Sequence, residues 1–245
     1  LGTGTATVVA QVAADTLGVP IGRVHVEIGD TDLPPAAGSG GSIGTASCAN
    51  GVRVACEQLL ARRQDRRAVG QMLSRLRGRD DSATARYQPD AQPGFASHAF
   101  GAQFAEVAVD ADTGEVRVRR MLGAFACGRI LSERTARSQL LGGMIMGAGA
   151  ALTEGSVVDV RDGSYLNPDL AEYDVPVHAD IGAMRVLFVP EQDTALNPLG
   201  AKGLGEIGIV GAGAAVANAV FNATGIRVRD FPITPDKMIQ AFETG

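Results

Sequence analysis

The strongest constraint on the fold is a pair of alternating segments that a short turn joins. Residues 99–110 and 115–127 alternate apolar and polar side chains, which is the pattern of a strand with one covered face. The residues between them, Asp112, Thr113 and Gly114, supply the tight turn of an antiparallel hairpin. A chain that combines this hairpin with several helices is predicted to be α+β, with helices layered on mixed or antiparallel sheets, rather than a doubly wound parallel sheet.

Hydrophobic periodicity predicts the other elements. Helices are predicted over 5–17, ending before Gly18, over a long segment from about residue 45, over 135–152 and over about 208–223. Strands are predicted over 23–28, near 154–160 and near 184–189, and the last segment, 226–238, is interpreted as a strand and a terminal turn. The polar stretch 78–94, which contains two prolines, is interpreted as a linker or long loop.

The composition is 45% hydrophobic and 20% charged, as in an ordinary globular protein. No apolar run approaches the roughly 20 residues that span a bilayer. The net charge of -5 argues against a general polyanion binder. Basic residues gather at Arg62, Arg63, Arg66, Arg67, Arg75, Arg77 and Arg79. A solvated helix face or linker is favoured over a nucleic-acid patch, since no aromatic residue is interleaved before Tyr87.

Cysteine and histidine residues give no metal site by themselves. The three cysteines, Cys48, Cys56 and Cys127, form no C-x-x-C pair. An iron–sulfur cluster normally needs four thiolates, so the chain alone is expected to hold none, and the odd count argues against a disulfide framework. The three histidines, His25, His98 and His178, are scattered and interpreted as structural.

Glycine is the unusual component, with 32 residues that concentrate in short loops. Gly2, Thr3 and Gly4 precede a predicted helix, whose N-terminus presents free N–H groups to anions. The loop 38–45 also enters a helix, and its N–H groups and hydroxyls suit a phosphate or another polar ligand. It lacks the lysine of a Walker loop and the spacing of a dinucleotide fingerprint. A tight turn and a flexible loop remain the alternatives.

The third loop, 197–208, places Glu206 between glycines at the entry to an apolar helix. In a dry, glycine-lined pocket the pKa of this carboxylate would be raised by desolvation, and it could act as a base near neutral pH. The alternative is an ordinary glutamate that the helix dipole favours.

In their order along the chain, these segments resemble one family. The motifs are GTGTATVVAQVAADTLGVP, GSGGSIGTASCANGVRVAC, FGAQFAEVAVDADTGEVRVRR, GRILSERTARSQLLGGMIMGAGAALTE and NPLGAKGLGEIGIVGAGAAVANAVFNATGIRVR. They are similar to the molybdopterin-binding subunit of the xanthine dehydrogenase/aldehyde oxidase family, with the bacterial multi-subunit aldehyde oxidoreductases as the closest branch. The resemblance covers nearly the whole chain except about 62–95.

The resemblance implies a molybdenum hydroxylase. The family binds a pterin dithiolene that holds molybdenum with oxo, sulfido and hydroxide ligands. Glu206 matches the family's catalytic glutamate, which takes the proton from the hydroxide. The water-derived oxygen then attacks an electron-poor carbon, and hydride passes to the sulfido ligand. The substrates implied are aldehydes or N-heterocycles of the xanthine or purine type.

The same resemblance assigns the cofactor residues. Gly2, Thr3 and Gly4 match a loop near the pterin phosphate, and Ser39, Gly40, Gly41, Ser42 and Gly44 match the second cofactor loop. Gly205 matches a position beside the metal. Met146 stands where some members have a glutamine that reaches the oxo group, and Thr3 stands where many have glutamine, although many bacterial relatives also lack these glutamines. No side chain is expected to ligate a metal.

The chain opens without Met or a secretory signal and is interpreted as beginning inside a longer protein. Residues 1–245 are expected to be the C-terminal portion of the cofactor-binding domain. The absent N-terminal half would supply another cofactor loop and much of the substrate funnel, so the isolated chain is expected to be inactive. The cofactor is expected as a mononucleotide or as the cytosine dinucleotide form.

Expected partners are that half, an FAD-binding subunit, a subunit with 2Fe–2S clusters, a small-molecule substrate and a second copy in a dimer. Neither nucleic acid nor a membrane span is expected. The location is expected to be cytoplasmic, with the periplasm as alternative. Two other interpretations remain open: a non-catalytic remnant or scaffold that keeps the fold, and a phosphate-binding domain unrelated to molybdenum.

Overall fold

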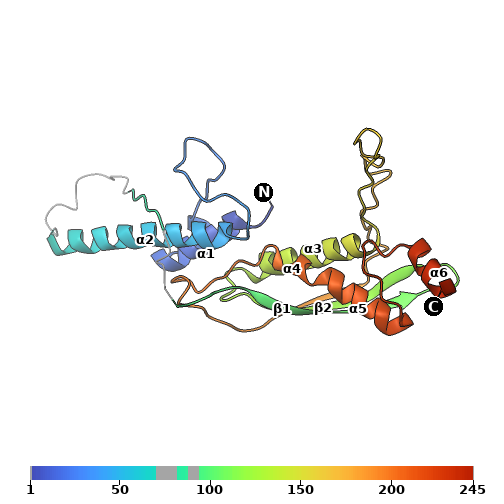
Figure 1. Ribbon diagram of the computed structural model, residues 1–245. Helices are drawn as coiled ribbons and strands as arrows, with labels where there is room; N and C mark the ends of the chain where they lie inside the picture. The colour runs from blue at the N-terminus through green and yellow to red at the C-terminus, as the bar shows by residue number, and fades with distance from the viewer. Residues whose placement is uncertain (1, 70–81, 88–93, 245) are drawn as a thin grey trace. The chain divides into compact units, whose positions relative to one another are not determined.

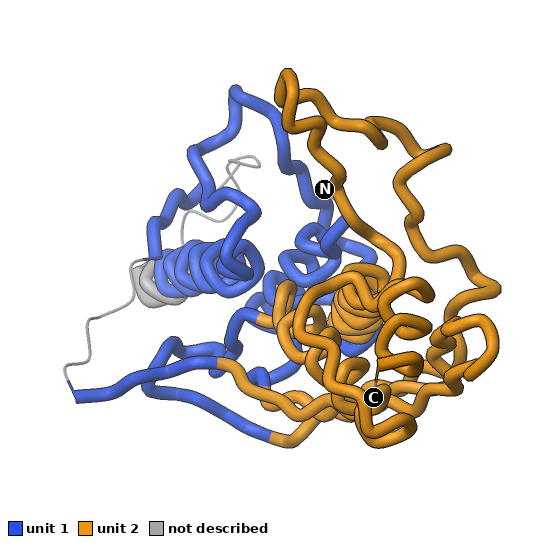
Figure 2. The backbone as a smooth tube through the Cα atoms, turned by 45° about the vertical axis from the view of Figure 1, so that its right-hand side comes forward, with its two compact units in different colours: residues 1–98, 127–135, 191–203 blue, residues 99–126, 136–190, 204–245 orange. Residues whose placement is uncertain are grey.

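The computed structural model describes residues 2–69, 82–87 and 94–244, and for 63–69 it describes the backbone alone. Most of the predicted linker at 78–94, and the side chains of the arginine cluster beyond Arg62, lie outside the described residues. The chain forms two compact units, which Figure 2 colours separately. The first unit comprises residues 1–98, 127–135 and 191–203, and the second comprises 99–126, 136–190 and 204–245.

The first unit is built on two helices that pack together, α1 (Thr5–Leu17) and α2 (Gly44–Val69). Helix α1 has the predicted bounds, and it ends at Gly18, which takes a left-handed φ of 65° that favours glycine. The core of this unit contains residues from α1, from α2 and from the segment 191–203, and the segment 127–135 packs against it. It consists of Val8, Val12, Ala49, Leu199 and Ala201, with Leu131 packed against it.

The strand predicted at 23–28 is wrong. A single turn of 3-10 helix, η1 (Ile21–Arg23), starts the segment, and residues 24–28 carry no regular structure. The alternation of side chains is real, and Val24 has extended backbone angles. A strand also needs a neighbour for its N–H and C=O groups, and none of the described residues pairs with this segment.

The second unit contains a three-stranded sheet of β1 (Phe100–Val109), β2 (Val116–Ala126) and β3 (Ala183–Phe188), in that order. Strands β1 and β2 form the predicted antiparallel hairpin, and β3 runs parallel to β2. Gly114 in the turn has a φ of 71°. The predictions of the hairpin, of a strand near 184–189 and of a mixed α+β fold are therefore confirmed.

Four helices complete the second unit, and Figure 1 labels them. They are α3 (Glu133–Leu152), of which the first three residues belong to the first unit, α4 (Ile207–Val210), α5 (Ala212–Thr224) and α6 (Pro235–Thr244). Helix α5 packs on β1. Val220, Ile233 and Met238 form a core there, against which Val107, Val109, Val116, Leu152, Ala217, Ile226, Val228 and Phe242 pack.

Three further predictions need correction. The segment 154–160 is no strand, since only an isolated bridge joins Val158 to Tyr165. The end of the chain is a helix rather than a turn, and Ile226 and Val228 pack against the core without strand pairing. The helix predicted at 208–223 is two helices, because the chain breaks at Gly211.

The stretch Ile207–Thr224 is, by its 18 residues and its composition, apolar enough to be a candidate membrane span. No run of this length was predicted from the sequence. Gly211 divides the stretch, and α5 buries Ala212, Ala215, Val216 and Val220 as a core helix does. A core helix passes the same criteria as a membrane span, so the stretch is weak evidence for one.

Candidate functional site

The first predicted loop is held by its contact with the start of α3. Gly4 precedes α1 with a φ of 84°, and a Cβ on it would lie 2.5 Å from Cγ2 of Thr135. Glycine is therefore required at this position, by conformation and by space. Beside it, the hydroxyls of Thr3 and Thr5 lie 3.1 Å apart and share a hydrogen bond.

The second loop, 38–44, leads into α2 and is open. Gly41 and Ser42 take consecutive left-handed φ angles of 54° and 59°. A Cβ on Gly38, Gly40 or Gly41 would meet nothing within 4 Å. Among the residues that the structure describes, the N–H groups of Ser39, Gly40 and Gly41 have no hydrogen-bond partner. Such donors, at the positive end of a long helix, suit an anion.

Ser42 also connects this loop to the third one. A Cβ on Gly203 would lie 2.9 Å from both Cβ and the carbonyl oxygen of Ser42, so only glycine allows this approach. Two of the three predicted segments therefore meet within the first unit. The contact lies three residues before Glu206 in the chain.

The third loop is held by buried polar contacts that sequence reasoning missed. Asn197 is buried and donates from Nδ2 to the carbonyl of Ala201 at 2.7 Å. The backbone N–H of Lys202 donates to the carbonyl oxygen of Cys127 at 3.0 Å, and the backbone N–H of Arg129 donates to the carbonyl oxygen of Gly200 at 2.6 Å. Glycines dominate this motif, and attention to them left its first residue unexamined. An asparagine in a loop often folds its side chain back to the backbone of the same loop, as the buried Asn197 does.

Lys202 is the charged centre of this loop. Its side chain is 7% exposed, and Nζ lies 2.5 Å from Oε1 of Glu191 and 3.5 Å from Oδ2 of Asp193. Burial alone lowers the pKa of Lys202, but the hydrogen bond to Glu191 and the charges of both carboxylates outweigh it and raise the pKa. The same bond, with the N–H of Gly128, holds the pKa of Glu191 below its ordinary value.

Glu206 belongs to the second unit, at the N-cap of α4. It has φ −111° and ψ −13°, and its side chain makes no capping hydrogen bond. Its side chain is exposed in this chain, so the described residues do not supply the dry pocket that the sequence analysis expected. Gly205, immediately before it, is half-buried.

The backbone of α4 lies directly on α3. A Cβ on Gly143 would lie 2.8 Å from the backbone N of Ile209 and 2.9 Å from Cα of Gly208. A Cβ on Gly208 would in turn lie 2.6 Å from the carbonyl oxygen of Leu140. The glycines of α3 and α4 thus admit a close approach of the two backbones. They fix the helix that begins directly after Glu206.

Gln103 of β1 contacts α4 independently, and sequence reasoning missed it. Its Nε2 donates to the carbonyl oxygens of Gly208 at 3.0 Å and of Ile207 at 3.3 Å. Met146, in contrast, stands 59% exposed on α3. Gly205, Glu206 and Met146 therefore share the second unit, while all the predicted residues from Gly2 to Gly44 belong to the first.

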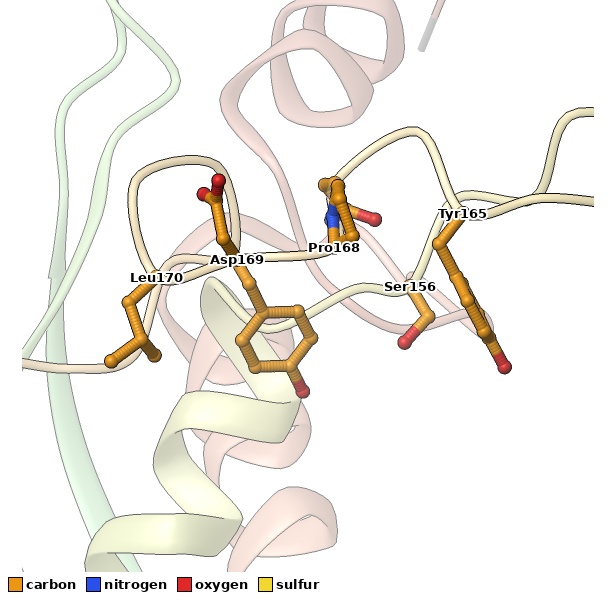
Figure 3. Close-up of a pocket in the computed structure, with 7 residues that line it drawn as sticks. Ser156, Tyr165, Pro168, Asp169 and Leu170 are labelled. Carbon is orange, nitrogen blue, oxygen red and sulfur yellow. The ribbon is translucent and has the colours of Figure 1, made fainter.

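One surface pocket of the second unit contains none of the predicted site residues (Figure 3). It is lined by Ser156, Tyr165, Asn167, Pro168, Asp169, Leu170 and Tyr173. All of these follow α3 and precede β3, and the hydroxyl of Tyr173 donates to Glu154 at 3.0 Å. The pocket carries no group that the predicted chemistry uses.

The sequence and the fold match known proteins. The chain belongs to the family of molybdopterin cofactor-binding domains, whose profile matches residues 1–182. Within that family it is similar to the molybdenum-binding subunits of the xanthine dehydrogenase and aldehyde oxidoreductase type. The family and the fold class predicted from the sequence are thereby confirmed. The roles of individual residues remain predictions.

Two curated relatives and one solved structure give the extent of the match. The aldehyde oxidoreductase molybdenum-binding subunit PaoC of Escherichia coli K12 is 45% identical over 98% of this chain and 35% of its own length. The probable hypoxanthine oxidase XdhD of the same organism is 32% identical over 99% and 28%. CO dehydrogenase from Oligotropha carboxidovorans shares the fold, with a TM-score of 0.83 at 22% identity over 99% of this chain and 34% of that one. The chain thus spans about a third of the length of these relatives.

Proposed function

We propose that this chain is part of the molybdenum-binding subunit of a hydroxylase that oxidises aldehydes or N-heterocycles with oxygen derived from water. One observation carries the proposal. The open loop 38–44 packs through Ser42 on Gly203, so a cofactor loop and the segment leading to Glu206 are built onto each other. Aldehydes are the first substrates to test, since PaoC is named for that activity.

The residues present fit the cofactor. Ser39, Gly40 and Gly41 offer unpaired N–H groups beside space that no described residue fills, as the phosphate of a pterin cofactor requires. We assign the holding of the cofactor to Gly2, Thr3, Gly4, Ser39, Gly40, Gly41, Ser42 and Gly44, and positions on the metal side to Gly205 and Met146. When bound, the cofactor supplies two-electron redox chemistry at molybdenum.

Glu206 is assigned the role of general base. One of its Oε atoms accepts the proton of the water-derived nucleophile, which allows the oxygen to attack an electron-poor carbon of the substrate. A base near neutral pH needs surroundings of low polarity, and Glu206 is exposed in this chain. We therefore expect the N-terminal half of the subunit and the bound substrate to cover it.

The proposal extends to the complete enzyme. The cofactor is the cytosine dinucleotide form, and electrons leave through 2Fe–2S clusters and FAD in partner subunits, in a cytoplasmic enzyme that can form a dimer. The names of two relatives as subunits of dehydrogenases support a multi-subunit enzyme. This chain without the rest of its subunit binds the cofactor weakly or not at all. A non-catalytic scaffold is disfavoured, since the loop from Lys202 to Glu206 keeps its motif and its buried support.

The test is a variant of the open loop in the enzyme assembled with its partners. Gly40→Val adds a side chain whose Cβ, its chain neighbours apart, meets no described residue within 4 Å, so the fold is retained. If the loop holds the cofactor, molybdenum and phosphorus per subunit fall severalfold. Gly22→Val is the matched control, because Gly22 is also exposed with nothing within 4 Å. Full molybdenum content in Gly40→Val would contradict the proposal.

A further inference from the structure

We propose that Gln103 is a positioning residue for the reaction: its amide binds the first carbonyls of α4 and so fixes the backbone from which Glu206 projects. The proposal rests on the proposed function of Glu206 as the base. Both residues belong to the second unit. Gln103 itself touches neither substrate nor cofactor in this assignment, and it acts through the helix.

Gln103 occupies a position where an apolar side chain is expected. From Gln103 onward on β1 the odd-numbered residues are half-buried and the even-numbered ones are exposed, and Val107 and Val109 of the half-buried set pack against the core beneath α5. Gln103 belongs to the same set, opposite Gly123 of β2. A polar side chain on a covered face costs free energy unless it is hydrogen-bonded. The NH₂ group of the Gln103 amide meets this requirement through α4.

The two hydrogen bonds fix which way the amide points. Two carbonyl oxygens, of Ile207 and Gly208, lie within hydrogen-bond distance of Nε2. Only the NH₂ group can face them, because the amide oxygen would repel both. Oε1 is then turned to the other side, where it is buried and has no partner among the described residues. The side chain is thus oriented for the carbonyls of α4.

The helix needs this support because it is broken just beyond. Helix α4 ends at Val210. The N–H of Gly211 donates to the carbonyl oxygen of Ile209 instead of making the regular α-helical hydrogen bond four residues back. A break of this kind frees carbonyls at the end of the preceding turn, and an inserted side chain can satisfy them. Gly211 leaves space for the insertion, since a Cβ there would lie 3.2 Å from Nε2 of Gln103.

Helix α4 is thereby held on two sides. Gly143 of α3 contacts the backbone of Gly208 and Ile209, and Gln103 of β1 binds the carbonyls of Ile207 and Gly208. An isolated four-residue helix has no stability of its own. Without the hydrogen bonds from Gln103, the turn that follows Glu206 would open more often, and the carboxylate would leave its reactive position.

The experiment uses Gln103→Met in the assembled enzyme, which keeps the volume and removes both donors. Hydrogen–deuterium exchange of the peptide 204–212 is expected to become roughly tenfold faster, for the loss of two hydrogen bonds. The kcat is expected to fall about tenfold or more, because small displacements of a reacting group are costly. The KM and the molybdenum content stay near those of the wild type. Gln240→Met, on an exposed position of α6, is the control and leaves all four quantities unchanged.

A double variant separates positioning from general damage. If Gln103 acts through Glu206, then Gln103→Met causes no further loss of kcat in a Glu206→Gln background. Additive losses would overturn the proposal. So would a kcat of Gln103→Met within about twofold of wild type, where displacement should cost at least ~10-fold.

Two further results keep the outcomes distinct. Should Gln103→Met fail to assemble, Gln103→Glu has the same shape and turns an acceptor towards two carbonyls, and unchanged exchange and kcat in that variant overturn the proposal. If Glu206→Gln itself stays active, the proposed function fails. If Glu206→Gln is inactive while Gln103→Met is normal, only the role of Gln103 fails.

Discussion

Lys202 and Glu191 form a buried ion pair, with Nζ 2.5 Å from Oε1, and the pair ties the two ends of the loop 191–203 together. Asp193 adds a second carboxylate at 3.5 Å, and Ser97 donates a hydrogen bond to it. The side chains of Glu191 and Asp193 are 26% and 16% exposed, so both carboxylates lose most of their water. The segment that leads to Glu206 therefore starts from a charged anchor.

Lys202→Met should destabilise the protein by about 1–3 kcal/mol, because it leaves two partly buried carboxylates without their cation. Thermal unfolding of the assembled subunit measures this. Arg120→Met is the comparison, since the Arg120–Glu106 pair has side chains 71% and 52% exposed and should contribute at most about 1 kcal/mol. Equal midpoints for the two variants would contradict the anchoring role. Turnover in Lys202→Met should fall less than in Glu206→Gln.

The anchor also predicts a pH dependence. The hydrogen bond to Lys202 lowers the pKa of Glu191 below the ordinary 4.5, and the hydrogen bond from Ser97 lowers that of Asp193 below 3.8. A lowered pKa in the folded state gives stability that is present above the ordinary value and lost as the pH falls through the folded value. The free energy of unfolding should therefore drop below about pH 4.5 more steeply in the wild type than in Lys202→Met. Denaturant unfolding over this range measures it, and parallel curves would count against the anchor.

Glu206→Gln in the assembled enzyme should keep the fold and the molybdenum, since the side chains are nearly isosteric. An amide cannot accept the proton, so turnover should fall about 10²–10⁴-fold. The measurements are steady-state turnover with an aldehyde and a purine, and molybdenum per subunit. If the variant holds full molybdenum and stays within about threefold of the wild-type rate, where loss of a base should cost at least ~10²-fold, Glu206 is not the base.

The contact between α3 and α4 can be tested with neighbouring glycines. Gly143→Ala places a Cβ 2.8 Å from the backbone of Ile209 and should cost about 1–3 kcal/mol. Gly142→Ala is the matched control, because nothing lies within 4 Å of its new Cβ. Alanine is the better helix former, so the control should gain about 0.5–1 kcal/mol. The two variants should thus shift the melting temperature in opposite directions, and the same direction would refute the contact.

The elements that were predicted correctly are those whose pattern is local. Helix α1 has both a regular period and a terminal Gly18, and the hairpin has its alternation and its turn within one continuous stretch. The segment 23–28 shows why alternation alone fails, since a strand exists only when a partner supplies hydrogen bonds. Helix α6 does carry a signal in the sequence: Thr234, Pro235 and Asp236 form a typical helix start, within the segment predicted as a strand and a terminal turn.

The residues of the candidate site likewise divide into those that a local pattern indicates and those that depend on distant partners. Loop glycines can be found from motif and spacing, and the structure explains Gly4 and Gly203 by close approaches to Thr135 and Ser42. Asn197 and Gln103 were missed because their partners are backbone atoms, which the sequence indicates only indirectly. For Gln103 the trace was indirect, as the one polar residue in the series Gln103, Ala105, Val107 and Val109 on a covered strand face. The exposure of Glu206 could not be foreseen, since its surroundings depend on tertiary packing.

The contact of α3 with α4 is made by the backbone of glycines, so the turn that follows Glu206 does not depend on the side chains that α3 exposes. These exposed residues include Ser138, Gly142, Met146 and Ala150, which recur at four-residue intervals along α3. Substitutions at Ser138, Gly142 and Ala150 can therefore accumulate without displacing the backbone at Glu206, whereas Met146 is assigned to the metal side of the proposed site. We expect relatives to differ at these three exposed positions while the glycine contact that fixes the turn after Glu206 stays the same.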